Sequence, residues 1–142
     1  MVFLGVNYVA VALAAFASFF FGAAWYMTLA KPWLAASEFT PDQRARIEGG
    51  AERRPAPFLV AFISLLIMAY VFAALMGHLG ASAFTVRGGL LSGFLLWLGF
   101  VVTTIATNYA FGMRRTSLTL IDGGHWLGVL LIQGAVIGMV GL

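Results

Sequence analysis

Long apolar runs alternate with short polar segments along the chain. Three runs carry no charged side chain and a fourth is broken only by Asp122: residues 2–30, 58–86, 88–113 and 116–142. A helix needs about 20 apolar residues to cross a bilayer, and backbone groups in hydrocarbon must hydrogen-bond within their own segment. The pattern therefore predicts four membrane-spanning helices, at about 4–29, 58–80, 88–111 and 117–140.

The polar segment 31–57 separates the first two expected spans. Its stretch "TPDQRARIEGG" has Thr40 as a helix cap, Pro41 at the first helical position and Gln43 completing a capping box. These signals predict a short surface helix. The expected fold is therefore an all-α membrane protein, a four-transmembrane-helix bundle whose one large polar loop carries a surface helix.

Composition leads to the same class. The chain has 142 residues, which suits the single domain 1–142, and it is 62% hydrophobic but only 9% charged. Soluble domains carry roughly 25% charged residues, so most of this surface is expected to face the lipid bilayer. The net charge of +3 comes from basic residues at the ends of apolar runs, which does not indicate nucleic-acid binding.

The basic residues also predict an orientation. Seven of them fall in the two loops on one side of the expected bundle, whereas only Arg87 falls on the other side. Loops rich in Lys and Arg stay in the cytoplasm, so both termini are expected outside it, with the protein in the inner (plasma) membrane. The seven are Lys31, Arg44, Arg46, Arg53, Arg54, Arg114 and Arg115.

Asp122 and His125 raise the main question about function, because they lie in an otherwise apolar span. Counting along the helices at 1.5 Å per residue places several polar side chains of three spans at one depth near the basic loops. Intramembrane ionisable residues are often functional. The candidate cluster comprises Trp25, Tyr26, Thr107, Asn108, Asp122 and His125.

Two interpretations of Asp122 stay open. In the first, the carboxylate caps and anchors the hairpin between spans three and four, through Asn108 or through Arg114 or Arg115. In the second, it carries a proton or binds a substrate in a cavity. His125 lies three positions further on, so the carboxylate is able to orient the imidazole.

A metal or haem site is not expected. Asp122 and His125 have no third ligand nearby, and the chain has no cysteine for a disulfide, a thiolate site or a thioether link. The other histidine, His78, lies at the opposite end of the expected bundle, so the two histidines cannot hold one haem. We therefore predict no cofactor.

Small residues recur at four-residue spacing in several spans. Such spacing lets helix backbones approach closely, and we expect the contacts to lie within the bundle rather than at a dimer seam. The expected packing residues are Gly22, Gly89, Gly93, Gly124, Gly128, Gly134 and Gly138.

The stretches "GAAWY" (22–26), "KPW" (31–33), "LLWLGFVVTTIATNYAFG" (95–112) and "LIDGGHWLGVLLIQGAVIG" (120–138) resemble the domain-of-unknown-function family 1761. The resemblance implies a small, mostly bacterial, four-span membrane protein without an established activity. At the position of His125 the family is equally expected to carry tyrosine, which leaves Asp122 as the stronger candidate. The matching residues are Gly22, Trp25, Tyr26, Trp33, Gly99, Phe100, Asn108, Asp122 and Gly124.

Two functions remain in competition. The first is a non-enzymatic structural or accessory subunit, with a membrane-protein partner or a second copy of the chain. It accounts for the small size and the glycine-rich faces, and no catalytic motif is present. The second is a carrier or binding protein for a small molecule or for protons, centred on Asp122.

Overall fold

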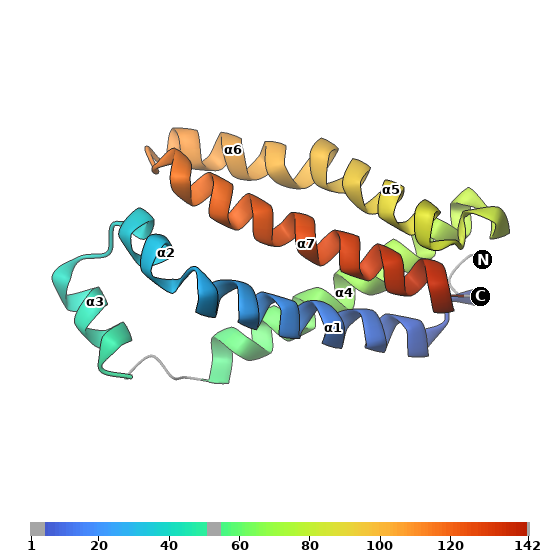
Figure 1. Cartoon of the computed structure of the whole chain (residues 1–142), viewed down its shortest axis with the longest axis horizontal. Helices are drawn as coiled ribbons and strands as arrows, with labels where there is room; N and C mark the ends of the chain where they lie inside the picture. The colour runs from blue at the N-terminus through green and yellow to red at the C-terminus, as the bar shows by residue number, and fades with distance from the viewer. Residues whose placement is uncertain (1–4, 51–54, 142) are drawn as a thin grey trace.

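The computed structural model describes residues 5–50 and 55–141. These parts of the chain are almost entirely helical (Figure 1). The α-helices are α1 (Tyr8–Thr28), α2 (Ala30–Ser37), α3 (Pro41–Glu48), α4 (Pro55–Leu79), α5 (Val86–Leu96), α6 (Val102–Phe111) and α7 (Thr116–Val140).

Four helical rods are long and apolar enough to cross a membrane, as the sequence predicts. Three of them are α1, α4 and α7. The other, span three (Val86–Phe111), joins α5 and α6 through η3 (Trp97–Val101), one turn of π-helix. Large apolar side chains such as Phe20, Phe100 and Leu120 are about two-thirds exposed or more. An all-α multi-pass membrane protein accounts for this surface.

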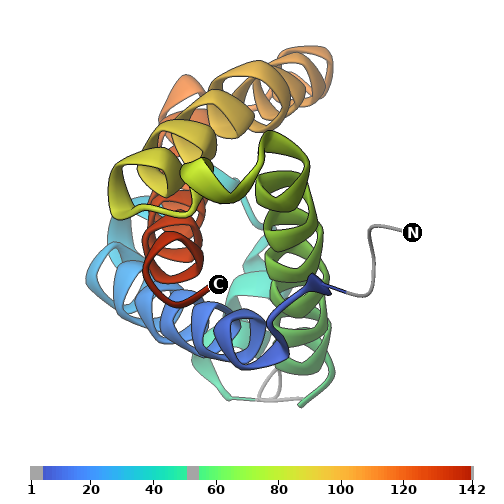
Figure 2. The ribbon, with the colours of Figure 1, turned by 90° about the vertical axis from the view of Figure 1, so that its right-hand side faces the viewer.

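α7 lies at the centre of the packing. It contacts α1 on one side and span three on the other, while α4 packs mainly on α1. The end-on view in Figure 2 shows α7 between α1 and α5, with α4 to the side. α2, α3 and the α6–α7 turn lie together at the left of Figure 1, here called the basic end.

The basic end holds Lys31, Arg44, Arg46, Arg114 and Arg115, whereas Arg87 begins span three at the other end. Arg53 and Arg54, which contribute to the orientation inferred from the sequence, lie outside the described residues.

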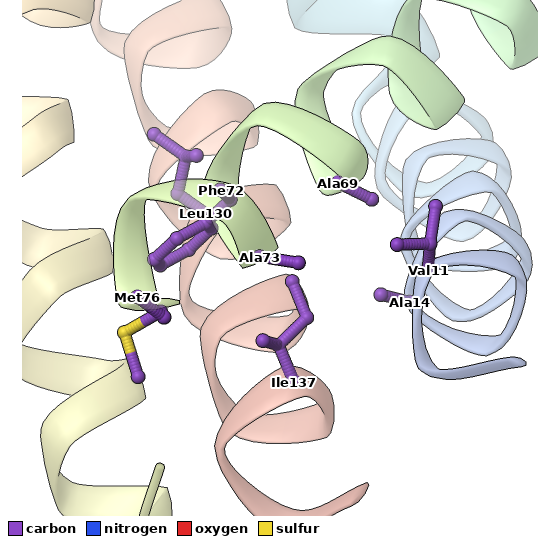
Figure 3. Packing of buried hydrophobic residues seen from close by; sticks show 8 residues of the cluster. All are labelled: Val11, Ala14, Ala69, Phe72, Ala73, Met76, Leu130 and Ile137. Carbon is purple, nitrogen blue, oxygen red and sulfur yellow. The ribbon is translucent and has the colours of Figure 1, made fainter. Parts of the chain in front are cut away.

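An apolar core joins α1, α4 and α7 towards the end opposite the basic end (Figure 3). Small side chains such as Ala14 and Ala69 let α1 and α4 approach, and Phe72 and Ile137 fill the space beside them. The cluster comprises Val11, Ala14, Ala69, Phe72, Ala73, Met76, Leu130 and Ile137.

Glycines bring α5 and α7 into backbone contact. A side chain at Gly89 would collide with the backbone of Gly134, and one at Gly93 with the carbonyl of Leu130. Gly138 lies against the backbone of Thr85 in the same way. These contacts lie within one chain, and they need residues without a Cβ because the helix axes run so close.

The surface helix is confirmed as α3. The Thr40 hydroxyl accepts a hydrogen bond from the backbone N–H of Gln43 at 3.3 Å, and the Gln43 side-chain oxygen accepts one from the backbone N–H of Thr40 at 2.9 Å. The described parts of the segment 31–57 contain more helix than the sequence predicts, because α2 precedes α3 and α4 already begins at Pro55.

Candidate functional site

Asp122 hydrogen-bonds to two tyrosines from two other helices. The Tyr26 hydroxyl of α1 donates to Oδ1 at 2.7 Å, and the Tyr109 hydroxyl of α6 donates to Oδ2 at 2.6 Å. Asp122 itself is only 9% exposed. Both carboxylate oxygens are therefore engaged inside the protein, and one side chain links α1, span three and α7.

Two tryptophans hold the backbone on either side of Asp122. The Trp25 indole N–H of α1 donates to the carbonyl of Ile121 at 3.1 Å, and the Trp97 N–H of η3 donates to the carbonyl of Gly123 at 2.8 Å. Four donors from two neighbouring spans thus converge on residues 121–123. We call Trp25, Tyr26, Trp97, Tyr109, Asp122 and His125 the Asp122 cluster.

Glycines make room for the aromatic rings of this cluster. A Cβ at Gly124 would lie 3.0 Å from the Trp25 ring, and a Cβ at Gly22 would lie 2.8 Å from Nε2 of His125. At Gly128 an added Cβ would collide with the ring of Phe21. The glycines of α1 and α7 therefore leave space that large side chains of the facing helix occupy.

His125 is enclosed by aromatic rings. Its ring lies parallel to Phe21, with centroids 6.2 Å apart, and the centroids of Tyr26 and Trp126 are 4.8 and 4.9 Å away. The residue is 8% exposed, and its Nδ1 atom is buried without a hydrogen-bond partner. Nδ1 has no partner and Nε2 faces Gly22, so no hydrogen bond from Asp122 orients the imidazole.

The structure does not bring Thr107 and Asn108 into the cluster. Both are exposed on the outer face of α6, and the Thr107 hydroxyl donates to its own helix, at the carbonyl of Thr103, 2.9 Å away. Asp122 therefore does not pair with Asn108. The neighbouring residue, Tyr109, faces α7 instead.

The arginines of the α6–α7 turn do not reach Asp122 either. Arg115 pairs with Glu38 at 3.0 Å, and Arg114 donates to the carbonyl of Ser37 at 3.3 Å. Both bonds run to the end of α2. The two arginines thus fasten α2 to the turn, and the expected contact with the carboxylate is replaced by the two phenols.

Tyr109 and Trp97 are the members of the cluster that the sequence reasoning missed. A signal for Tyr109 was present, since Val102, Ile105 and Tyr109 follow the spacing of one helix face. Trp97 gives no comparable signal, because an aromatic residue in a span is equally suited to face lipid.

A second polar contact crosses the interior further along α7. The Gln133 amide donates to the Ser18 hydroxyl and to the carbonyl of Leu65, each at 3.1 Å, and its own Oε1 atom has no partner. At the end of the bundle, the Asn7 side chain donates to the carbonyl of Val140 at 2.9 Å. Polar contacts between α1 and α7 thus recur along the whole interface.

Within residues 5–50 and 55–141, no three acidic or histidine side chains are placed to share a metal ion. Two phenols donate hydrogen bonds to the Asp122 carboxylate, and two indoles donate to the backbone carbonyls on either side of it. This arrangement holds three spans in register.

Comparison with known proteins gives a family and little else. No curated protein and no solved structure matches the chain. A family model with the description "Protein of unknown function (DUF1761)" matches residues 9–138, which is most of the chain. The chain therefore belongs to this family of unknown function.

Proposed function

We propose that this protein is a non-enzymatic structural or accessory subunit of a membrane assembly. The observation that carries the proposal is the use of both Asp122 oxygens by Tyr26 and Tyr109 inside the chain. A substrate would have to share Asp122 with two phenols that already occupy one acceptor site on each oxygen, whereas a carboxylate that ties three helices together needs only those two phenols. In this proposal, Asp122 in the fourth span has a structural role.

The polar side chains on the outer face of α6 favour the proposal that this helix contacts a protein partner. Thr103, Thr107 and Asn108 are exposed there, although they belong to a membrane-spanning rod. Polar side chains in lipid are costly, and Asn or Thr in a span commonly hydrogen-bonds to a neighbouring helix. A helix of another membrane protein, or of a second copy, would satisfy the Asn108 amide.

The orientation that we propose puts the basic end in the cytoplasm of a bacterial cell and both chain termini outside it. Five described basic residues lie at that end, against Arg87 at the other. The positive-inside rule retains such loops on the cytoplasmic side of the inner membrane. Labelling of a single cysteine at Gln43 from inside and outside the cell tests this.

A photo-crosslinking residue at Thr107 in the living cell tests the accessory role. The matched control is the same residue at Val60, which is exposed on the apolar face of α4. We expect a discrete protein adduct from Thr107 and only lipid adducts from Val60. Lipid adducts alone at both positions would count against a partner on α6.

A second candidate, a carrier for protons or a small molecule, is favoured by one observation. Within the Asp122 cluster, Nδ1 of His125 is buried without a hydrogen-bond partner, and such atoms can mark the place of a water molecule or a ligand. Proton flux into liposomes that contain the purified protein tests this role. Flux that Asp122→Asn abolishes would favour the carrier over the accessory subunit.

A further inference from the structure

The two halves of span three are held in the bundle in different ways. α5 meets α7 backbone to backbone, since a side chain at Gly89 would collide with the carbonyl of Gly134. The ten residues of α6 are all exposed or half-buried. Within the described residues, Tyr109 is the one side chain of α6 that hydrogen-bonds to another helix, at 2.6 Å from Asp122. The first half is therefore fixed by close packing, and the second depends on one hydrogen bond.

η3 joins the two halves and contains one residue more than a continuous α-helix would. The backbone N–H of Val102 donates to the carbonyl of Trp97, five residues back, whereas an α-helix uses the carbonyl four residues back. One extra residue rotates all later residues by about 100° and moves them by about 1.5 Å along the axis. In this register, Tyr109 faces α7 and Asn108 lies outside.

Two hydrogen bonds keep the extra residue in η3. At the start of the turn, the Trp97 indole donates to the carbonyl of Gly123 at 2.8 Å, and beyond the turn the Tyr109 hydroxyl donates to Asp122. Both acceptors belong to neighbouring residues of α7. A π-helical turn is rare compared with continuous α-helix, and such turns occur frequently at functional sites. The Asp122 cluster thus maintains the turn from both sides.

The α6–α7 turn offers another place for the extra residue. If η3 becomes α-helical while α5 stays fixed, each residue of α6 moves into the position that its successor holds now. The α6–α7 turn then contains one residue more, which surface loops accept readily. Met113 in this turn is 89% exposed. Arg114 and Arg115 lie on the α7 side of it, so they can keep their bonds to the end of α2.

The threonine hydroxyls of α6 do not oppose such a change. Thr103 donates to the carbonyl of Gly99 at 3.0 Å, and Thr107 donates to the carbonyl of Thr103 at 2.9 Å. These bonds run to carbonyls of the same rod four residues back, so they rotate together with the helix. Among the described side chains, the hydrogen bond that the change breaks is the one from Tyr109 to Asp122.

We propose that span three switches between two registers through η3. In the register described above, Tyr26 and Tyr109 occupy the two oxygens of Asp122. In the other register η3 is α-helical and Asn108 takes the position of Tyr109. Its side chain is shorter than a phenol, so Oδ2 of Asp122 is released. The switch goes beyond the accessory role, because it controls access to Asp122 within one chain and needs no partner.

Engineered disulfides between span three and α7 test the proposal. A Cβ at Gly123 would lie 3.6 Å from Cγ2 of Val102, so a side chain fits there, and the Gly123 carbonyl that accepts from Trp97 is retained. Gly123→Cys with Val102→Cys reports the described register. Gly123→Cys with Val101→Cys reports the other register, in which residue 101 takes the place of residue 102. The chain has no cysteine of its own.

Each double variant is oxidised as the whole protein in liposomes, and gel shift with a maleimide polymer follows the loss of free thiols. A minor conformation commonly holds about 0.1–10% of the molecules. We therefore expect the pair at 101 and 123 to close about ten to a thousand times more slowly than the pair at 102 and 123. A pair at 101 and 123 that never closes would overturn the proposal.

Removal of the phenol should favour the second register. Tyr109→Phe is expected to speed closure of the pair at 101 and 123 about tenfold, the change that about 1.4 kcal/mol produces. Tyr8→Phe, at an exposed tyrosine, is the control and should leave this rate unchanged. Equal rates in the two backgrounds would show that the bond to Asp122 does not hold the register, and the switch would be rejected.

Deletion of Gly99 separates a change of register from simple flexing of α6. It removes the extra residue and no side chain, so α6 should keep its present register within a continuous α-helix. We expect the pair at 102 and 123 to close as before and closure of the pair at 101 and 123 to slow at least about tenfold. Undiminished closure of the second pair, or lost closure of the first, would contradict the proposal.

Discussion

α7 and span three pack against each other, but the protein buries a much larger share of α7 than of span three. In the most apolar stretch of α7, 44% of the residues are buried, compared with 11% in span three. α7 is nevertheless the less hydrophobic of the two. Inside lipid, burial follows the side chains that hydrocarbon solvates poorly and the glycines that allow close contact.

The residues on α7 show how this works. Asp122, His125 and Gln133 are all buried, and Gly134 and Gly138 meet the backbone of span three. Span three instead turns Thr103 and Thr107 outward, where each hydroxyl returns to its own helix. The central position of α7 is thus determined by its polar and small residues, and the position of span three is determined by its contact with α7.

The largest effect is expected from a side chain placed between α5 and α7. Gly89→Leu would drive carbon atoms into the backbone of Gly134, which cannot move aside as a side chain can. We expect a loss of more than about 3 kcal/mol in the free energy of unfolding, beyond ordinary overpacking. Unfolding by SDS in mixed micelles, followed by circular dichroism, measures it.

Gly99→Leu is the matched control, since Gly99 lies on the same rod with nothing within 4 Å of an added Cβ. It should unfold like the wild type. Similar losses for both variants would mean that glycine in span three matters for helix flexibility, and that the close contact does not.

The next effect concerns the two phenols on Asp122. Tyr26→Phe and Tyr109→Phe each remove one hydrogen bond to the carboxylate, and each should cost about 1–2 kcal/mol of unfolding free energy. Tyr8→Phe, at an exposed tyrosine, is the control. If both variants match Tyr8→Phe, the cluster does not hold the spans together.

A smaller effect is expected at Gln133. Gln133→Leu removes two hydrogen bonds, but it also removes an Oε1 atom that is buried without a partner. Ser18 keeps its bond to the carbonyl of Ala14. These opposing changes should leave stability within about 1 kcal/mol of the wild type. A drop above about 3 kcal/mol in the same SDS titration would contradict this balance.

The smallest effect is expected at the basic end. Glu38→Gln breaks the ion pair with Arg115, whose two side chains are 42% and 61% exposed. Exposed pairs contribute about 0–1 kcal/mol and weaken in salt. The difference from wild type, measured by thermal unfolding at low salt, should disappear near 1 M NaCl. A difference that persists there would indicate a role beyond charge.

The spans and the surface helix could be predicted because their signals are local. Apolar runs give four rods, and Thr40 with Gln43 forms the capping box that begins α3. α2 was not predicted, since its eight residues follow α1 after a break at Leu29 and its end is held by Arg114 and Arg115. Such a helix depends on contacts distant in sequence.

The sequence predicts the depth of the candidate site along the spans, but it predicts only in part which side chains point into the bundle. Counting residues along the helices places Tyr26, Asp122 and part of span three at the same depth. The hydrogen bonds of Asp122 to Tyr26 and Tyr109 agree with this depth. Which side chain of span three points inward depends on η3, since a π-helical turn holds extra backbone and rotates every later residue. Asn108 thus lies outside and Tyr109 inside.

The central place of α7 has a consequence for biosynthesis, because the ribosome makes α7 after α1, α4 and span three. Before Thr116 and the residues after it enter the bilayer, α1 and α4 can pack against each other. Span three at that stage still lacks α7, the helix on which it packs. Quality-control proteases in the membrane would meet that unpaired rod in every nascent chain. This unpaired stage ends when α7, which carries Asp122, packs between α1 and span three.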